Sequence, residues 1–132
     1  MGERASLDQV PAAASEDRGD SGVADNASLE ALQARLGVTF EDPSLLRRAL
    51  THRSFANEHP ELMQADNERL EFLGDAVLDF LAGSYLFFHY PEMREGDLTN
   101  LRAALVRTET LAEFAQELEL GPCLLLGRGE EA

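Results

Sequence analysis

Nine consecutive residues, 67–75, place three carboxylates inside an otherwise apolar stretch. Glu68, Glu71 and Asp75 are three and four positions apart, and Asp79 follows four positions later. Because an α-helix turns by about 100° per residue, this spacing puts the acids on one face of a helix. Like charges held so close repel each other unless a cation compensates them. Hard oxygen ligands favour Mg²⁺ or Mn²⁺, so the spacing predicts a divalent-metal site.

The same nine residues resemble the signature of the ribonuclease III family of double-stranded-RNA endonucleases. The resemblance extends upstream to residues 50–55 and downstream to residues 95–106, and covers the chain from about Ser28 onward. It implies an all-α helical bundle like the family's endonuclease domain. It also implies metal-dependent hydrolysis of double-stranded RNA, in ribosomal and other RNA processing, by a homodimer. DNA is not an expected substrate.

The resemblance further implies a role for each acid. Glu71 would be a metal ligand, and Asp75 a catalytic residue that binds the metal or orients the attacking water. Glu68 and Glu95 match acidic positions that engage the substrate. The expected cofactor is Mg²⁺, with Mn²⁺ as an alternative. Taken singly, Glu68 favours a solvated helix-face acid, whereas the three acids together favour a functional site. For Glu95 the alternative is a surface acid ahead of a helix N-terminus.

One departure from the family pattern concerns the second half of the metal site. The resembled enzymes complete it with an Asp and a Glu, three residues apart, on a later helix beyond a Gly-rich loop. Here the sequence ends within residues 127–132, where Glu130 and Glu131 are adjacent and cannot share a helix face. We therefore expect half a metal site, in a domain that is incomplete at its C-terminus and has no double-stranded-RNA-binding domain. The alternative is a catalytically inactive RNA-binding or assembly module.

Charge and composition restrict the function classes further. The net charge is −14, with eleven basic residues that are all Arg, and this opposes tight binding to phosphates unless bound cations offset it. The sequence contains neither an apolar run long enough for a membrane span nor a secretory signal pattern. The single cysteine, Cys123, cannot form an internal disulfide and is expected to be a small buried apolar residue. A cytoplasmic protein without membrane contact is expected.

Apolar periodicity and helix-capping residues predict where the helices lie. Residues 1–27 have the composition of a disordered leader, and the folded domain is expected over 28–132. No segment alternates with the period of a strand, so the fold class is all-α. Residues 57–66 read as a loop. Helices are predicted from Ser28 to Leu36, from Pro43 to Leu50, from Asn67 to Phe88, from an N-cap at Asp97 to Val106, and from a capping box at Thr110 until Gly121.

The central helix is apolar on nearly all sides, which predicts burial in the core or against a partner chain. Gly74 in its middle indicates a close approach, either across that interface or by another helix of the same chain. Upstream, His52 and Arg53 either touch RNA or satisfy local hydrogen bonds.

Overall fold

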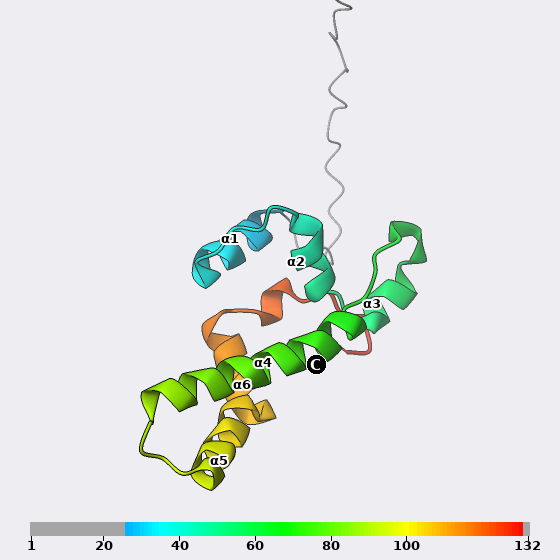
Figure 1. The fold of residues 1–132 in the computed structure, drawn as a ribbon. Coiled ribbons are helices and arrows are strands. Elements are labelled where there is room, and N and C mark those ends of the chain that lie inside the picture. Colours follow the sequence, from blue (N-terminus) through cyan, green and yellow to red (C-terminus); the bar gives the residue numbers. More distant parts are fainter. Residues whose placement is uncertain (1–25, 131–132) are drawn as a thin grey trace, which may run out of the picture.

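The computed structural model describes residues 26–130, which fold into helices without a β-sheet. The only bridge between extended segments in this part of the chain is a parallel one that pairs Thr51 with Leu125. The all-α class predicted from the sequence is therefore confirmed (Figure 1). The elements are α1 (Asn26–Leu36), α2 (Pro43–Ala49), α3 (Arg53–Glu58), η1 (Pro60–Leu62), α4 (Glu68–His89), α5 (Glu95–Val106), α6 (Thr108–Glu117) and η2 (Gly121–Cys123), where η denotes a 3₁₀ helix.

The first three helices and the C-terminal segment share one small hydrophobic core. Leu125 follows η2 and reaches back to α2, where its amide donates to the carbonyl of Leu50 at 2.9 Å. Cys123 is 2% exposed, as predicted for a buried apolar residue. The core consists of Leu29, Leu32, Leu46, Leu50, Phe55, Cys123 and Leu125, with Phe40 and Leu120 packed against it.

Local sequence signals fix the ends of the first two helices. Gly37 has a φ of +70°, the left-handed conformation that terminates α1 at little cost for glycine. Asp42 caps α2, because its carboxylate accepts from the amide of Ser44 at 3.0 Å and from the Ser44 hydroxyl at 2.6 Å. These hydrogen bonds, the one from the hydroxyl first, hold the pKa of Asp42 below its usual value. Pro43 occupies the first turn, where its missing N–H costs nothing.

Helix α4 is the longest element, with 22 residues, and α5 folds back along its second half. In Figure 1, α4 runs diagonally across the molecule and turns into α5 at the end farthest from α3. Arg102 of α5 crosses α4 at Gly83, where a methyl group would meet the Arg102 side chain at 3.7 Å. Nothing lies within 4 Å of the corresponding position at Gly74, so of the two alternatives for this glycine the crossing by another helix of the same chain is wrong.

The apolar side chains of α4 are largely exposed. Leu86 is the only buried residue of α4, at 3% exposure, whereas Phe72 is 83% exposed and Phe80 is 72% exposed. The expectation that this helix lies in the core is thus wrong for the single chain. A partner chain as the cover stays a prediction.

Several boundaries also differ from the sequence predictions. Helix α1 begins at Asn26, two residues ahead of the predicted Ser28, and residues 1–25 of the predicted leader lie outside the described residues. Asp97 is not the N-cap of α5, because Arg94 holds that position. Thr110 does not open a capping box, since α6 already starts at Thr108 and the Thr110 hydroxyl instead donates to the carbonyl of Ala104 at 2.8 Å. Residues predicted as one loop contain the end of α3 and all of η1.

Among the described helices, none is both long enough and apolar enough to cross a membrane.

Candidate functional site

The N-terminal end of α4 is attached to the junction between α2 and α3. The Asn67 side-chain amide donates to the carbonyl of Ala49 at 2.9 Å, and the Asn67 backbone amide donates to the carbonyl of Thr51 at 3.0 Å. One residue later, the Glu68 amide donates to the carboxylate of Asp66 at 3.2 Å. These contacts fix the first turn of α4 relative to the core, so the side chains that follow have a defined direction.

Three of the predicted acids then follow along α4. Glu68, Glu71 and Asp75 are all exposed and, at spacings of three and four residues, share one face of this continuous helix. The side chains of Glu71 and Asp75 make no hydrogen bond or ion pair within residues 26–130, whereas Glu68 does. These three acids form the acidic stripe of α4, which therefore presents two uncompensated carboxylates, those of Glu71 and Asp75, to any cation in solution.

Glu68 is paired with a cation from the preceding helix. The Arg53 guanidinium lies 3.4 Å from the Glu68 carboxylate, and both side chains are more than half exposed. An exposed pair of this kind contributes little to stability, about 0–1 kcal/mol. Its consequence is geometric, because it directs an Arg of α3 toward the acidic stripe.

Glu95 does not join the other three acids within one chain. It is the first residue of α5 and lies beyond the C-terminal end of α4, whereas Glu68 lies at the N-terminal end (Figure 1). With a rise of 1.5 Å per residue, the part of α4 between Glu71 and His89 alone spans roughly 27 Å. Glu95 is exposed at the N-terminus of a helix, the position that favours an acid electrostatically.

The carboxylates of α4 fit a divalent metal in their chemistry but supply few ligands. Mg²⁺ in proteins is commonly held by one or two carboxylates together with water and substrate phosphates. Glu71 and Asp75, four residues apart, match that description. In the part of the chain that the structure describes, no group of three or more His, Cys, Asp or Glu residues is placed to hold a metal. Of the two adjacent acids near the C-terminal end of the sequence, Glu130 is exposed, and Glu131 lies outside the described residues.

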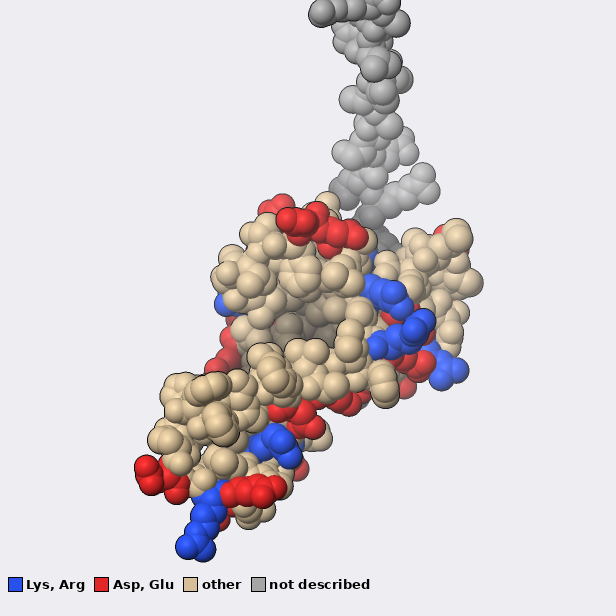
Figure 2. Space-filling view, in the orientation of Figure 1, with Lys and Arg blue, Asp and Glu red and all other residues tan. Residues whose placement is uncertain are grey.

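Charges on the surface are unevenly distributed. Figure 2 shows acidic side chains along the lower edge of α4 and several basic side chains near the end of the molecule where α2 and α3 lie. Between α4 and the α1–α2 part, the same view shows a hollow with mostly uncharged walls. The basic group lies close to the start of α4, where the candidate acids begin.

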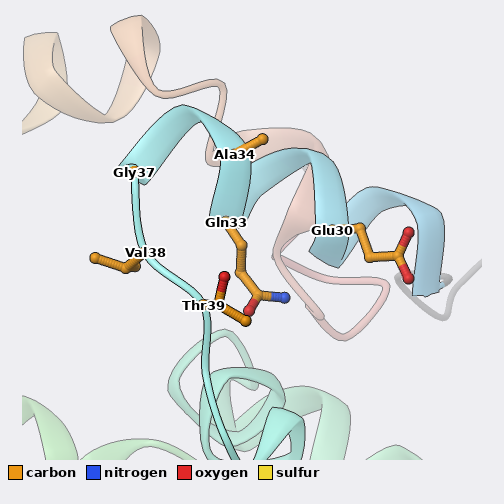
Figure 3. A pocket seen from close by; sticks show the side chains of 6 residues that line it. All are labelled: Glu30, Gln33, Ala34, Gly37, Val38 and Thr39. Atoms are coloured by element: carbon orange, nitrogen blue, oxygen red, sulfur yellow. The ribbon is translucent and has the colours of Figure 1, made fainter.

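A separate hollow of about 270 Å³ lies between α1 and the loop that follows it (Figure 3). Its central polar side chain, Gln33, is already engaged: the amide oxygen accepts from Phe40 N at 2.8 Å and the amide nitrogen donates to Leu29 O at 3.3 Å. Glu30 is its only ionisable lining residue. The hollow therefore offers no group of converging reactive side chains.

Comparison with known proteins assigns the family. A family model described as ribonuclease-III-like matches residues 42–132, more than half of the chain. The chain belongs to the ribonuclease III family. Ribonuclease 3 of Roseiflexus sp. (strain RS-1) is 59% identical over 107 residues, which are 80% of this chain and 45% of that protein. Ribonuclease 3 of Enterococcus faecalis is 51% identical over 108 residues, covering 82% of this chain and 47% of that protein. This ribonuclease III homologue spans about half the length of the curated relatives it matches.

A solved structure confirms the type of helical fold. The nuclease domain of ribonuclease III from Campylobacter jejuni matches with a TM-score of 0.70 and 47% sequence identity, covering 78% of this chain and 68% of that one. That work describes structural flexibility in a region involved in dimer formation of the nuclease domain. The resemblance inferred from residues 67–75 is thereby confirmed at the level of family and fold.

The contacts that hold the site in place could not be predicted from the sequence, although His52 and Arg53 stood out as candidates. Asn67 and Arg53 make contacts with partners 18 and 15 positions away, which no local pattern shows. His52 was left open between RNA contact and local hydrogen bonding, and its ring caps α3 by accepting from the Ser54 amide at 3.1 Å. The sequence feature that could have indicated this cap is a His followed two residues later by Ser, at the start of a short helix.

Proposed function

We propose that this chain acts as the nuclease domain of a double-stranded-RNA endoribonuclease, with Glu71 and Asp75 at the reacting phosphate. The main support is a pair of exposed, unpaired carboxylates on one face of a helix whose first turn is anchored to the core, in a member of the ribonuclease III family. A helix held at its start presents these carboxylates in a fixed geometry, and fixed geometry is what positions a water and a phosphate for in-line attack.

Each acid has a distinct part in this proposal. Asp75 is the catalytic residue, and would either help Glu71 to hold the metal or orient the attacking water. Glu71 is a metal ligand, and Glu68 and Glu95 contact the substrate. When bound, Mg²⁺ (or Mn²⁺) would lower the pKa of a bound water and offset the charge of the phosphate. The Arg53 guanidinium lies beside Glu68, and in this proposal it supplies a cation next to the acidic stripe that would contact the RNA backbone.

The partner in this proposal is a second copy of the chain. Large apolar side chains of α4 are exposed, and such a surface is unfavourable in water unless another surface covers it. The report of a dimer-forming region in the Campylobacter jejuni nuclease domain supports the same arrangement. The apolar surface of α4 is defined here as Phe72, Leu73, Val77, Phe80 and Leu81.

Cleavage of a long RNA duplex in Mg²⁺ tests the catalytic assignment. We expect discrete products from the chain, and a loss of about 10²-fold or more in rate for Asp75→Asn, which keeps the side-chain size and removes the negative charge. Asp79→Asn is the matched control, because Asp79 is also exposed and lies one turn further along the same helix. It should cleave like the unchanged chain.

Two results would contradict the proposal. Equal losses for Asp75→Asn and Asp79→Asn would mean that the general charge of α4, rather than one carboxylate, matters. No cleavage by a chain that circular dichroism shows to be folded would reject the enzymatic assignment. Duplex binding that persists in that case would favour the alternative, a catalytically inactive RNA-binding or assembly module.

A further inference from the structure

The segment after η2, residues 124–128, is attached to the first turn of α3 and is called the strap below. Its Gly127 amide donates to the Ser54 hydroxyl oxygen at 2.8 Å. Its Arg128 amide donates to both carboxylate oxygens of Glu58, at 3.1 and 3.2 Å. Leu125 forms the parallel bridge described above. Contacts at three positions therefore hold the strap against α2 and α3.

Ser54 is held in turn by His52. The His52 Nδ1 atom accepts from the Ser54 backbone amide at 3.1 Å, and a backbone N–H can only donate, so Nδ1 carries no proton here. The Ser54 hydroxyl, 2.6 Å from the same Nδ1, must then donate its hydrogen to the ring. Its lone pairs remain available for the Gly127 amide. The result is a directed chain of hydrogen bonds from Gly127 through Ser54 to His52.

The strap fits α3 closely only because residue 127 is glycine. A methyl group at Gly127 would lie 2.8 Å from the Ser54 Cβ and 3.0 Å from both the Ser54 carbonyl carbon and a Glu58 carboxylate oxygen. Gly127 is buried, and the nearby Arg128 is exposed. This contact therefore fixes one defined position of the strap.

The same turn of α3 also faces the candidate site. Arg53, between His52 and Ser54 in the sequence, forms the ion pair with Glu68 at 3.4 Å. We infer that Ser54 is a positioning residue for the acidic stripe. With His52 it locks the strap to the first turn of α3, and through Arg53 that turn orients Glu68. The hydrogen bonds that join Gly127, Ser54 and His52 are called the clamp. The effect of the clamp on cleavage rests on the proposed function, but the clamp itself can be measured without it.

Backbone amide exchange, measured by NMR on the full chain, tests the clamp. Ser54→Ala removes the acceptor, and we expect the Gly127 amide to exchange about two- to tenfold faster, the size expected for one lost hydrogen bond. The Leu125 amide, which donates to Leu50 O, is the internal control and should keep its protection. Unchanged exchange at Gly127 in Ser54→Ala would overturn the clamp.

Substitutions of His52 separate positioning from direct chemistry. His52→Asn places Oδ1 where Nδ1 lies, so it keeps the acceptor and removes the rest of the imidazole, whereas His52→Ala removes both. We expect His52→Asn to match the unchanged chain in Gly127 exchange and in cleavage of duplex RNA. Because Glu68 contacts the substrate in the proposed function, His52→Ala and Ser54→Ala should raise the half-saturating RNA concentration several-fold, with little change in turnover at saturating RNA. Faster Gly127 exchange with an unchanged half-saturating RNA concentration would overturn the positioning role.

Failure of the proposed function gives a different result. If the unchanged chain cuts no RNA, the proposed function fails, and the inference is then judged on the Glu68 amide, which donates to Asp66. Ser54→Ala should accelerate exchange at Glu68, and His52→Asn should not. A Glu68 amide whose exchange rate does not change in Ser54→Ala would overturn the link between the clamp and the acidic stripe.

Discussion

At the scale of single residues, Asn67 connects the core to the candidate site. It closes the α2–α3 junction with its side chain and its backbone amide, and α4 starts directly after it. We expect Asn67→Ala to lower the free energy of unfolding by about 0.5–1.5 kcal/mol, the usual net value of one hydrogen bond. Urea denaturation followed by circular dichroism measures this change.

The matched control for this substitution is Asn57→Ala. Asn57 is exposed near the end of α3 and its side chain makes no hydrogen bond within the described residues. It should leave the urea midpoint unchanged within error. Equal effects of the two substitutions would show that the contact with Ala49 adds nothing to stability.

The structural role of some single residues could be predicted from the sequence. Cys123 is buried, as predicted for a small apolar residue. The first helix ends at Leu36 as predicted, and Gly37 takes the left-handed conformation directly after it. The anchoring roles of Ser54 and Gly127 were not predictable, because the two residues are 73 positions apart and their contact depends on the tertiary fold. Sequence periodicity predicts local helix formation, and it contains no information on a contact between residues so far apart in the chain.

At the scale of elements, α4 was predicted nearly to the residue, but its surroundings were not. Its long apolar pattern and Pro91 define the helix, which ends at His89 against the predicted Phe88. The apolar pattern predicts that these side chains are buried, but it does not predict whether the same chain or a partner chain buries them. The single chain leaves them exposed. The short α3 escaped prediction because six residues give too few turns for a pattern.

Exposure of α4 leads to a test of self-association. Phe72 is the most exposed large apolar residue of that helix, at 83%, so Phe72→Asp should weaken a dimer that buries this surface. Sedimentation velocity at several concentrations should show a dimer for the unchanged chain and a shift of at least tenfold in the dissociation constant for Phe72→Asp, about 1.4 kcal/mol.

Met63→Asp controls for the added charge. Met63 is 91% exposed but lies next to η1, away from α4 in the sequence, so this variant should remain a dimer. A compact monomer at all concentrations for the unchanged chain would reject the dimer. An equal effect of both substitutions would mean that charge, rather than the covering of α4, controls association.

At the scale of the whole molecule, the net charge of −14 opposes both folding and approach to RNA. Salt should therefore stabilise the chain by screening, since the Debye length is about 10 Å at 0.1 M. Mg²⁺ should add a further effect if Glu71 and Asp75 bind it in the folded state only. A free concentration about tenfold above the dissociation constant contributes about 1.4 kcal/mol, which raises the unfolding midpoint by about 5 °C.

Thermal unfolding in NaCl and in MgCl₂ at equal ionic strength separates these two effects. The NaCl shift should be the same for the two double variants described next, because each removes two negative charges and the shift depends on the overall charge. The additional Mg²⁺ shift should vanish in the double variant Glu71→Gln, Asp75→Asn. It should survive in Glu109→Gln, Glu113→Gln, which neutralises another exposed pair four residues apart, on α6. Loss of the Mg²⁺ shift in both double variants would mean that any such pair of carboxylates affects Mg²⁺ binding. The acidic stripe of α4 would then not be a specific Mg²⁺ site.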